Sequence, residues 1–132
     1  YLLNDTSFLK SQSTSQGIIA KWNLQNKAYL KDGRLDSLLT NNDFGSFSQD
    51  TLFVNFIATN QTSGGNSGSP VFDAYGRFVG LNFDRNWEST VSDFYYDSSI
   101  CRNITLDVRY ILFCIEKYGN ATNIIKELQI YK

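Results

Sequence analysis

The middle of the chain carries the apolar segments that most clearly predict β-strands. Residues 52–59 combine β-branched and aromatic side chains at the density of a strand. Beyond a glycine-rich segment, residues 70–72 and 77–83 are typical of the two strands of a hairpin, joined by a turn at 73–76. Two further strands are expected near residues 91–96 and 103–106.

The C-terminal part of the chain changes to the period of a helix. Apolar residues recur there at i, i+3, i+4 and i+7, namely Val108, Ile111, Leu112 and Ile115. Asp107 precedes them as a candidate N-cap, and Gly119 follows as a candidate C′ residue. A second short helix is expected over residues 122–128.

The N-terminal third has a weaker pattern. It predicts, in chain order, a polar loop over residues 1–16, a short strand over 18–22, a turn-rich segment over 23–36 and one helical turn over 35–39. Asp32 and Gly33 together form a strong turn signal. We therefore expect one mostly β domain with C-terminal helices, in which residues 1–43 form a loosely structured lead-in and residues 44–132 the compact part.

Composition excludes several classes of function. The chain has 132 residues, of which 42% are hydrophobic, and this suffices for one domain with a core. Its 12 basic and 13 acidic residues form no basic patch for nucleic acid or an anionic membrane surface. The longest apolar run, residues 110–115, is too short to span a bilayer. With no histidine and no CxxC, neither a metal site nor a cofactor is expected.

The two cysteines, Cys101 and Cys114, are too few to define a disulfide framework. Cys114 lies in the apolar helical segment, where a buried free thiol is common. A disulfide between them and two free thiols both stay open.

The strongest candidate for chemistry is the segment Gly-Gly-Asn-Ser-Gly-Ser-Pro at residues 64–70. Glycines around Ser67 let the backbone turn sharply and present its hydroxyl, as in the nucleophile loop of a chymotrypsin-like serine protease. The N–H groups of Gly65 and Ser67 are then the expected donors of an oxyanion hole. The alternative is a glycine- and serine-rich turn without chemistry. A strand rather than a long helix is expected after Ser67, which excludes the nucleophile elbow of an α/β-hydrolase.

The chain lacks the base that such a serine needs. A serine hydroxyl is a poor nucleophile at neutral pH unless a base takes its proton, and this chain contains no histidine. In the chymotrypsin order, histidine and aspartate both precede the serine. We therefore expect both of them upstream of Tyr1, in a longer protein of which this chain, which also has no methionine, is an excerpt. The isolated chain is expected to be inactive as a peptidase.

A second candidate for chemistry lies at residues 80–88. The guanidinium of Arg85 can bind a substrate carboxylate through two parallel charge-assisted bonds, and the carboxylate of Asp84 suits an α-ammonium group. The alternative for Arg85 is a surface arginine paired with Asp84 or Glu88. Because adjacent strand residues point to opposite faces, both can reach one cleft only if the strand ends or bulges near Phe83.

The other side chains near these motifs are interpreted as structural. Phe83 and Trp87 are expected in the core, with a place in a substrate cleft as the alternative. Asp93 and Asp97 are expected to be solvated. Three aromatic residues are expected to pack the C-terminal helix: Tyr110, Phe113 and Tyr118.

Residues 64–88 (GGNSGSPVFDAYGRFVGLNFDRNWE) and 99–121 (SICRNITLDVRYILFCIEKYGNA) resemble the C-terminal end of bacterial dipeptidyl-peptidases of the chymotrypsin-like clan. The branch they most resemble is the Asp/Glu-specific one, of the dipeptidyl-peptidase 11 type. The resemblance is good over residues 44–130 and loose over residues 1–43. It implies that the fold is the second, nucleophile-bearing β-barrel half of a chymotrypsin-like double-barrel peptidase, and that the missing N-terminal barrel belongs to the same protein.

The resemblance also implies roles for single residues. Ser67 matches the nucleophile, and Gly65 and Ser67 match the oxyanion donors. Asp84 matches an acidic residue that helps bind the free amino group of the substrate. Arg85 matches the position where arginine goes with acidic penultimate residues and glycine with apolar ones.

The implied function is the release of N-terminal dipeptides whose second residue is Asp or Glu, by a periplasmic or secreted bacterial enzyme. Peptides are the implied partners, and a homodimeric full-length parent stays open. Two other functions also stay open. A glutamyl endopeptidase suits residues 65–70 and would not need a free substrate amine, whereas a non-catalytic, protease-like binding module suits the missing base.

Overall fold

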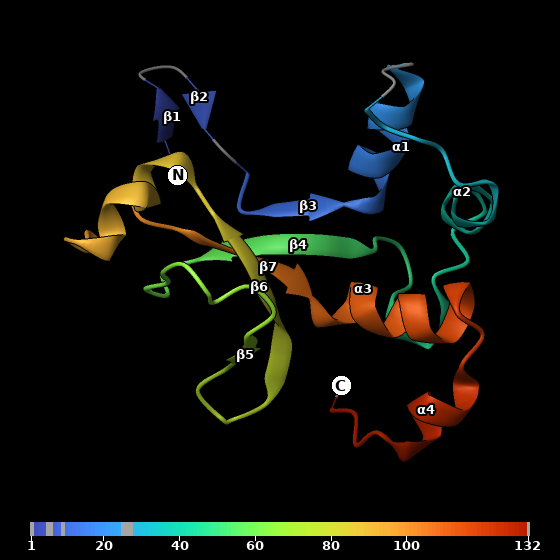
Figure 1. The fold of residues 1–132 in the computed structure, drawn as a ribbon. Helices are drawn as coiled ribbons and strands as arrows, with labels where there is room; N and C mark the ends of the chain where they lie inside the picture. The colour runs from blue at the N-terminus through green and yellow to red at the C-terminus, as the bar shows by residue number, and fades with distance from the viewer. Residues whose placement is uncertain (1, 5–6, 9, 25–27, 132) are drawn as a thin grey trace. The chain divides into compact units, whose positions relative to one another are not determined.

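The protein, for which we use a computed structural model, is described at residues 2–4, 7–8, 10–24 and 28–131 (Figure 1). It divides into two compact units: unit 1 comprises residues 1–13 and 54–108, and unit 2 comprises residues 14–53 and 109–132. Neither limit falls at residue 43, and the expected division of the chain into a lead-in and a compact part stays a prediction.

A five-stranded sheet forms the framework of unit 1, with the strand order β3-β4-β7-β6-β5. β7 lies between β4 and β6, as Figure 1 shows, and the pairings of β4 with β7, β6 with β7 and β5 with β6 are antiparallel. The five strands are β3 (Gln12–Thr14), β4 (Phe53–Ala58), β5 (Pro70–Phe72), β6 (Phe78–Arg85) and β7 (Asn103–Asp107). A separate antiparallel pair is formed by β1 (Leu2–Asn4) and β2 (Ser7–Phe8).

Most of the predicted strands are confirmed. β4 lies within the strand expected at residues 52–59, β5 and β6 form the expected hairpin, and β7 covers the strand expected at 103–106. The strand expected at residues 91–96 is wrong, because this segment contains the end of a 3₁₀-helix, η2 (Trp87–Asp93). Local bonds explain the difference: Ser92 Oγ donates to the carbonyl oxygen of Ser89 at 2.6 Å, and such bonds compete with strand pairing.

The more deeply buried side chains of β7 are polar. Asn103 and Thr105 are 1% and 0% exposed, whereas Ile104 and Leu106 between them are only half-buried. Asn103 Nδ2 donates to Thr105 Oγ1 at 2.9 Å and to Asn82 Oδ1 on β6 at 3.1 Å. A buried polar face needs such bonds, since an amide without a partner there costs free energy. Hydrogen bonds between side-chain amides and a hydroxyl therefore stabilise the covered face of the sheet.

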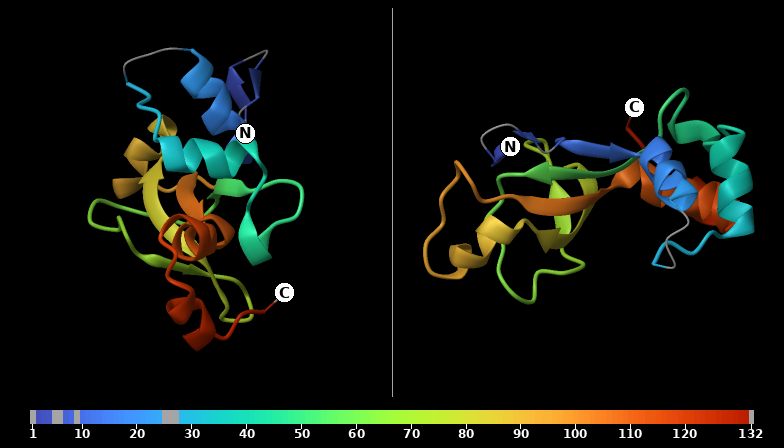
Figure 2. Two further views of the ribbon diagram at one scale, coloured as in Figure 1. Left: turned by 90° about the vertical axis from the view of Figure 1, so that its right-hand side faces the viewer. Right: turned by 90° about the horizontal axis from the view of Figure 1, so that it is seen from above.

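Helices and their apolar side chains form unit 2. Its described helical segments are α1 (Ser15–Asn23), α2 (Gly33–Thr40), η1 (Gly45–Phe47), α3 (Val108–Phe113, in unit 2 from residue 109), the π-helical turn η3 (Cys114–Tyr118) and α4 (Thr122–Glu127). α2 packs against α1 and against η3 (Figure 2). The core consists of four fully buried residues: Leu39, Phe44, Leu52 and Phe113. Side chains of α1, α2 and α3 pack around these four.

Two predictions for the N-terminal third are corrected. The strand expected at residues 18–22 is part of α1, because Ile18, Ile19 and Trp22 share one helical face and pack against the core of unit 2. The turn signal at Asp32 marks a helix start instead: its carboxylate accepts the N–H of Leu35 at 2.8 Å and caps α2. The helical turn expected at 35–39 is therefore confirmed as part of a longer helix, α2.

At the C-terminus, the expected helices are confirmed and one capping residue is corrected. Asp107 directly precedes α3, and α4 lies within residues 122–128. Gly119 has a φ of −83°, and the left-handed residue is Asn120, with a φ of 52°. The reason is the π-helical turn, in which the N–H of Gly119 still bonds to the carbonyl oxygen of Cys114 at 2.7 Å. Both cysteines are free.

We predict that Phe113→Ala destabilises unit 2 strongly, because Phe113 is 0% exposed and lies at the centre of its core. A cavity of this kind costs about 3–5 kcal/mol in the free energy of unfolding. Thermal and denaturant unfolding, with Phe113→Leu as a milder variant, measure the loss. Phe94→Ala is the matched control: Phe94 is 93% exposed, so little change is expected, and equal losses at the two sites would contradict the core assignment.

Candidate active site

The segment before Ser67 is a tight turn held by Asn66. The N–H of Asn66 donates to the carbonyl oxygen of Ser63 at 3.3 Å, and the Asn66 side-chain oxygen accepts the Ser63 N–H at 2.7 Å. Gly65 is the third residue of this turn and has a φ of 93°. Only glycine adopts such a φ without strain, so the sequence Ser-Gly-Gly-Asn specifies the turn.

Ser67 itself is the second residue of a following turn, which closes through the N–H of Ser69 and the carbonyl oxygen of Asn66 at 3.1 Å. Gly68 is the third residue of this turn and has a φ of 85°. Gly65 holds the same position in the first turn. The Ser67 side chain is exposed, and its Oγ donates a long bond of 3.3 Å to the carbonyl oxygen of Phe83. The hydroxyl therefore faces solvent instead of the interior of unit 1.

The two backbone donors expected near Ser67 remain available. The N–H groups of Asn66, Gly68 and Ser69 all bond to carbonyl oxygens within unit 1. For the N–H groups of Gly65 and Ser67, the described residues offer no acceptor. Two such donors beside a serine hydroxyl are what an oxyanion needs.

The side-chain amide of Asn82 holds this loop against the sheet. Asn82 is 5% exposed, and its Nδ2 donates to the carbonyl oxygen of Asn66 at 3.1 Å. Its backbone N–H donates to the carbonyl oxygen of Ser69 at 2.9 Å, and its carbonyl oxygen accepts the N–H of Gly68 at 2.7 Å. Because Asn103 on β7 donates to Asn82 Oδ1, the loop is linked through one amide to the middle of the sheet.

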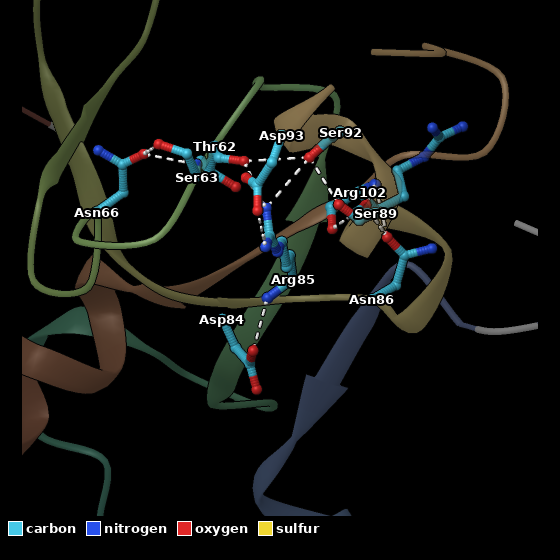
Figure 3. Close-up of polar contacts among 10 residues, drawn as sticks. All are labelled: Thr62, Ser63, Asn66, Asp84, Arg85, Asn86, Ser89, Ser92, Asp93 and Arg102. Atoms are coloured by element: carbon cyan, nitrogen blue, oxygen red, sulfur yellow. Dashed lines mark hydrogen bonds and ion pairs between the residues drawn. The ribbon is translucent and has the colours of Figure 1, made fainter. Parts of the chain in front are cut away.

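The expected irregularity at Phe83 is present. Asn82 pairs with Thr105 and Asp84 pairs with the next residue, Ile104, so Phe83 is an extra residue in β6. The strand nevertheless continues to Arg85. In Figure 3 the side chains of Asp84 and Arg85 extend to opposite sides of the strand, and Asp84 Oδ1 accepts the backbone N–H of Arg85 at 2.8 Å.

Arg85 is bound by partners that the sequence did not indicate. Its Nη1 and Nη2 lie 2.7 and 2.8 Å from the two carboxylate oxygens of Asp93 (Figure 3). Nη1 also donates to the carbonyl oxygen of Thr62 at 3.1 Å and to Ser92 Oγ at 3.3 Å. The hydrogen bonds from Arg85 lower the pKa of Asp93, and the same contact raises the pKa of Arg85.

Of the two aspartates expected to be solvated, Asp93 is exposed and Asp97 is half-buried, and both also accept hydrogen bonds. Asp93 is bound by Arg85, and Asp97 accepts the N–H and hydroxyl of Ser99 at 2.8 and 2.6 Å. The core position expected for Trp87 and Phe83 is also wrong, since these side chains are 84% and 44% exposed. Their exposure follows from the 3₁₀-helix and the bulge, which turn both side chains outward.

η2 is held in place by buried polar residues at its start. Asn86 is 8% exposed; its Nδ2 donates to the carbonyl oxygen of Ile100 at 2.9 Å, and its Oδ1 accepts the N–H of Arg102 at 2.8 Å. Ser89, 3% exposed, donates to the same oxygen of Asn86. These bonds, of which Figure 3 draws those from Asn86 to Ser89 and Arg102, fix the helix that carries Asp93 relative to the end of β6.

A family model described as Peptidase S46 matches residues 1–130. The chain belongs to the peptidase S46 family. An Asp/Glu-specific dipeptidyl-peptidase of Flavobacterium psychrophilum is 50% identical to it over 98 residues, which cover 74% of this chain and 14% of that protein. Dipeptidyl-peptidase 7 of Porphyromonas endodontalis is 36% identical over 133 residues, which cover 100% of this chain and 16% of that protein. The resemblance found in the sequence is thereby confirmed.

A solved structure shares the fold of this S46 chain. It is DPP11 of Porphyromonas endodontalis in complex with the dipeptide Arg-Asp, with a TM-score of 0.90 and 39% sequence identity. The match covers 98% of this chain and 19% of that one, so the chain spans less than a fifth of the length of these S46 relatives. An antiparallel sheet with a few helices is thus confirmed as the fold.

Two classes of feature do not occur within the described ranges of this S46 chain. None of the helices there has the length and apolar content needed to cross a membrane. In the same ranges, no three His, Cys, Asp or Glu side chains come together as metal ligands would. The site is therefore described by its serine, amides, carboxylates and guanidinium.

We predict that Asn82→Ala destabilises unit 1 and loosens the loop around Ser67. The change removes one bond from the carbonyl oxygen of Asn66, which keeps the N–H of Ser69, and one from Asn103 Nδ2, which keeps Thr105 Oγ1. Each lost bond costs about 0.5–1.5 kcal/mol in the free energy of unfolding. Thermal unfolding and amide exchange at residues 63–69 measure both effects. Asn123→Ala on exposed α4 is the control, and wild-type exchange rates in Asn82→Ala would contradict the assignment.

Proposed function

We propose that this chain is the nucleophile-bearing C-terminal part of a serine-type dipeptidyl-peptidase that releases N-terminal dipeptides with Asp or Glu in second position. One observation carries the proposal: the exposed hydroxyl of Ser67 belongs to a loop in which the N–H groups of Gly65 and Ser67 have no acceptor among the described residues. Membership of a peptidase family and the names of the relatives support the reaction class.

In the proposed reaction, Ser67 Oγ attacks the carbonyl carbon of the second substrate residue. The oxygen of that carbonyl becomes negative and is stabilised by the N–H groups of Gly65 and Ser67. The proton of Ser67 must pass to a base, and this chain contains no histidine. We place the histidine, and the aspartate that orients it, in the preceding part of the longer protein, in the other barrel of a chymotrypsin-like pair.

Substrate choice is assigned to the end of β6. A guanidinium binds a carboxylate through two parallel bonds, so Arg85 is the proposed partner of an acidic second residue. The P. endodontalis relatives are solved with the dipeptides Arg-Asp and Arg-Glu, both of which end in such a residue. Asp84, on the other side of the strand, is the proposed partner of the substrate's α-ammonium group.

Ser67→Ala in a full-length protein that carries this chain should abolish turnover, with kcat falling on the order of a millionfold, because only binding and the oxyanion donors remain. Release of a chromogenic group from a dipeptide substrate measures the loss. The isolated 132-residue chain should show no turnover. Turnover by the isolated chain that Ser67→Ala removes would contradict the missing base.

Arg85→Gly in the same protein should shift the preference from acidic to apolar second residues. The ratio of kcat/KM for Asp over Leu substrates should fall about 10- to 100-fold, as expected for the loss of a charged hydrogen-bonding partner. Arg77→Gly is the matched control, since Arg77 bonds to Asp73 in the β5–β6 turn. An unchanged preference in Arg85→Gly would contradict the assignment.

Acetylating the substrate amine separates the exopeptidase from an endopeptidase of the same clan. A dipeptidyl-peptidase should lose all activity on the acetylated substrate, because the amine-binding group then has no charge to bind. Cleavage that persists after acetylation would favour a glutamyl endopeptidase.

A further inference from the structure

Asp93 and Arg85 form a two-bonded ion pair within unit 1. The carboxylate oxygens of Asp93 lie 2.7 and 2.8 Å from Nη1 and Nη2, and the side chains of Arg85 and Asp93 are 21% and 39% exposed. A single exposed ion pair contributes little to stability. Two parallel bonds, however, fix the plane and direction of a guanidinium. The pair is therefore better suited to orienting Arg85 than to stabilising the fold.

Two more groups confirm that the guanidinium is held in one place. The carbonyl oxygen of Thr62 accepts from Nη1 at 3.1 Å, and Ser92 Oγ accepts from the same nitrogen at 3.3 Å. Ser92 is 4% exposed, so this bond lies at a covered position. Arg85 is thus bound by the segment that leads to the Ser67 loop and by η2, both of which Figure 3 shows around it.

The ion pair with Asp93 occupies one edge of the Arg85 guanidinium, and the described residues leave the second edge without an acceptor. An arginine has five N–H donors, which form two edges suited to a carboxylate: Nη1 with Nη2, and Nε with Nη2. The first edge of Arg85 is taken by Asp93, and the remaining Nη1 donor by Thr62 and Ser92. For the Nε–Nη2 edge, the described residues offer no acceptor.

We propose that Asp93 is a positioning residue that holds Arg85 by its Nη1–Nη2 edge, so that the Nε–Nη2 edge receives the acidic side chain of the substrate. The proposal rests on the function proposed above. Asp93 stays bound when the substrate enters, and the arginine does not have to be ordered at that moment. Because Asp93 also balances the charge of Arg85, the substrate carboxylate is selected by the geometry of two bonds more than by net charge.

The test is Asp93→Asn in the full-length protein, assayed with fluorogenic dipeptide substrates that carry Asp or Leu as second residue. An asparagine can accept one bond from Arg85 but not two, so the guanidinium loses its fixed direction. The ratio of kcat/KM for Asp over Leu should fall about 10- to 100-fold, mainly through a higher KM for the Asp substrate. Asp93→Glu, which keeps both acceptor oxygens, should restore part of the ratio.

Two further variants separate this role from a structural one. Asp97→Asn is the matched control, because Asp97 lies four residues further on and bonds to Ser99 instead of Arg85. In an Arg85→Gly background, Asp93→Asn should have no further effect on the ratio, since its only proposed action is through that arginine.

The other outcomes each decide a separate point. A higher kcat/KM for the Asp substrate in Asp93→Asn would show that Asp93 competes with the substrate, and it would overturn the proposal. Equal losses on both substrates, or no change while Arg85→Gly removes the acidic preference, would overturn it as well. If Arg85→Gly leaves the preference intact, it is the proposed function of Arg85 that fails.

Discussion

The arrangement of the candidate site depends on one buried amide, that of Asn82. A side chain that is 5% exposed and polar must find partners, and Asn82 finds them on both sides: Asn66 in the loop and Asn103 in the sheet. Two positive-φ glycines give the loop its turns, but they do not fix where it lies. The bonds of Asn82 do so, because they join the loop to β6 and β7, two neighbouring strands of the sheet.

How much of this site can be predicted from the sequence depends on how far apart the interacting residues lie along the chain. The turns around Ser67 and the bulge at Phe83 could be predicted, because each depends on residues a few positions apart. The pairing of Arg85 with Asp93 could not, since it requires a 3₁₀-helix over residues 87–93, whereas the sequence predicts a strand at residues 91–96. A signal was present in Ser89 and Ser92, whose hydroxyls bond to nearby polar groups.

Tertiary contacts decide the structure where the local pattern is ambiguous. In α1, the apolar residues 18, 19 and 22 fit a short strand as well as a helix, and their packing around Leu39 and Phe113 favours the helix. In β7, the covered side chains are the polar Asn103 and Thr105, and the apolar residues between them are only half-buried. The hydrogen bond from Asn103 to Asn82 connects this polar face to the loop around Ser67.

The ion pair at Arg85 changes how charge selectivity should be understood in this chain. An unpaired arginine attracts every anion, and its flexible side chain must be ordered each time one binds. An arginine already bound by Asp93 has little net charge to offer, so a carboxylate gains only if it meets the remaining edge with both oxygens. In the proposed function, selectivity for an acidic side chain then depends on the position of η2, which Asn86 and Ser89 fix against the end of β6.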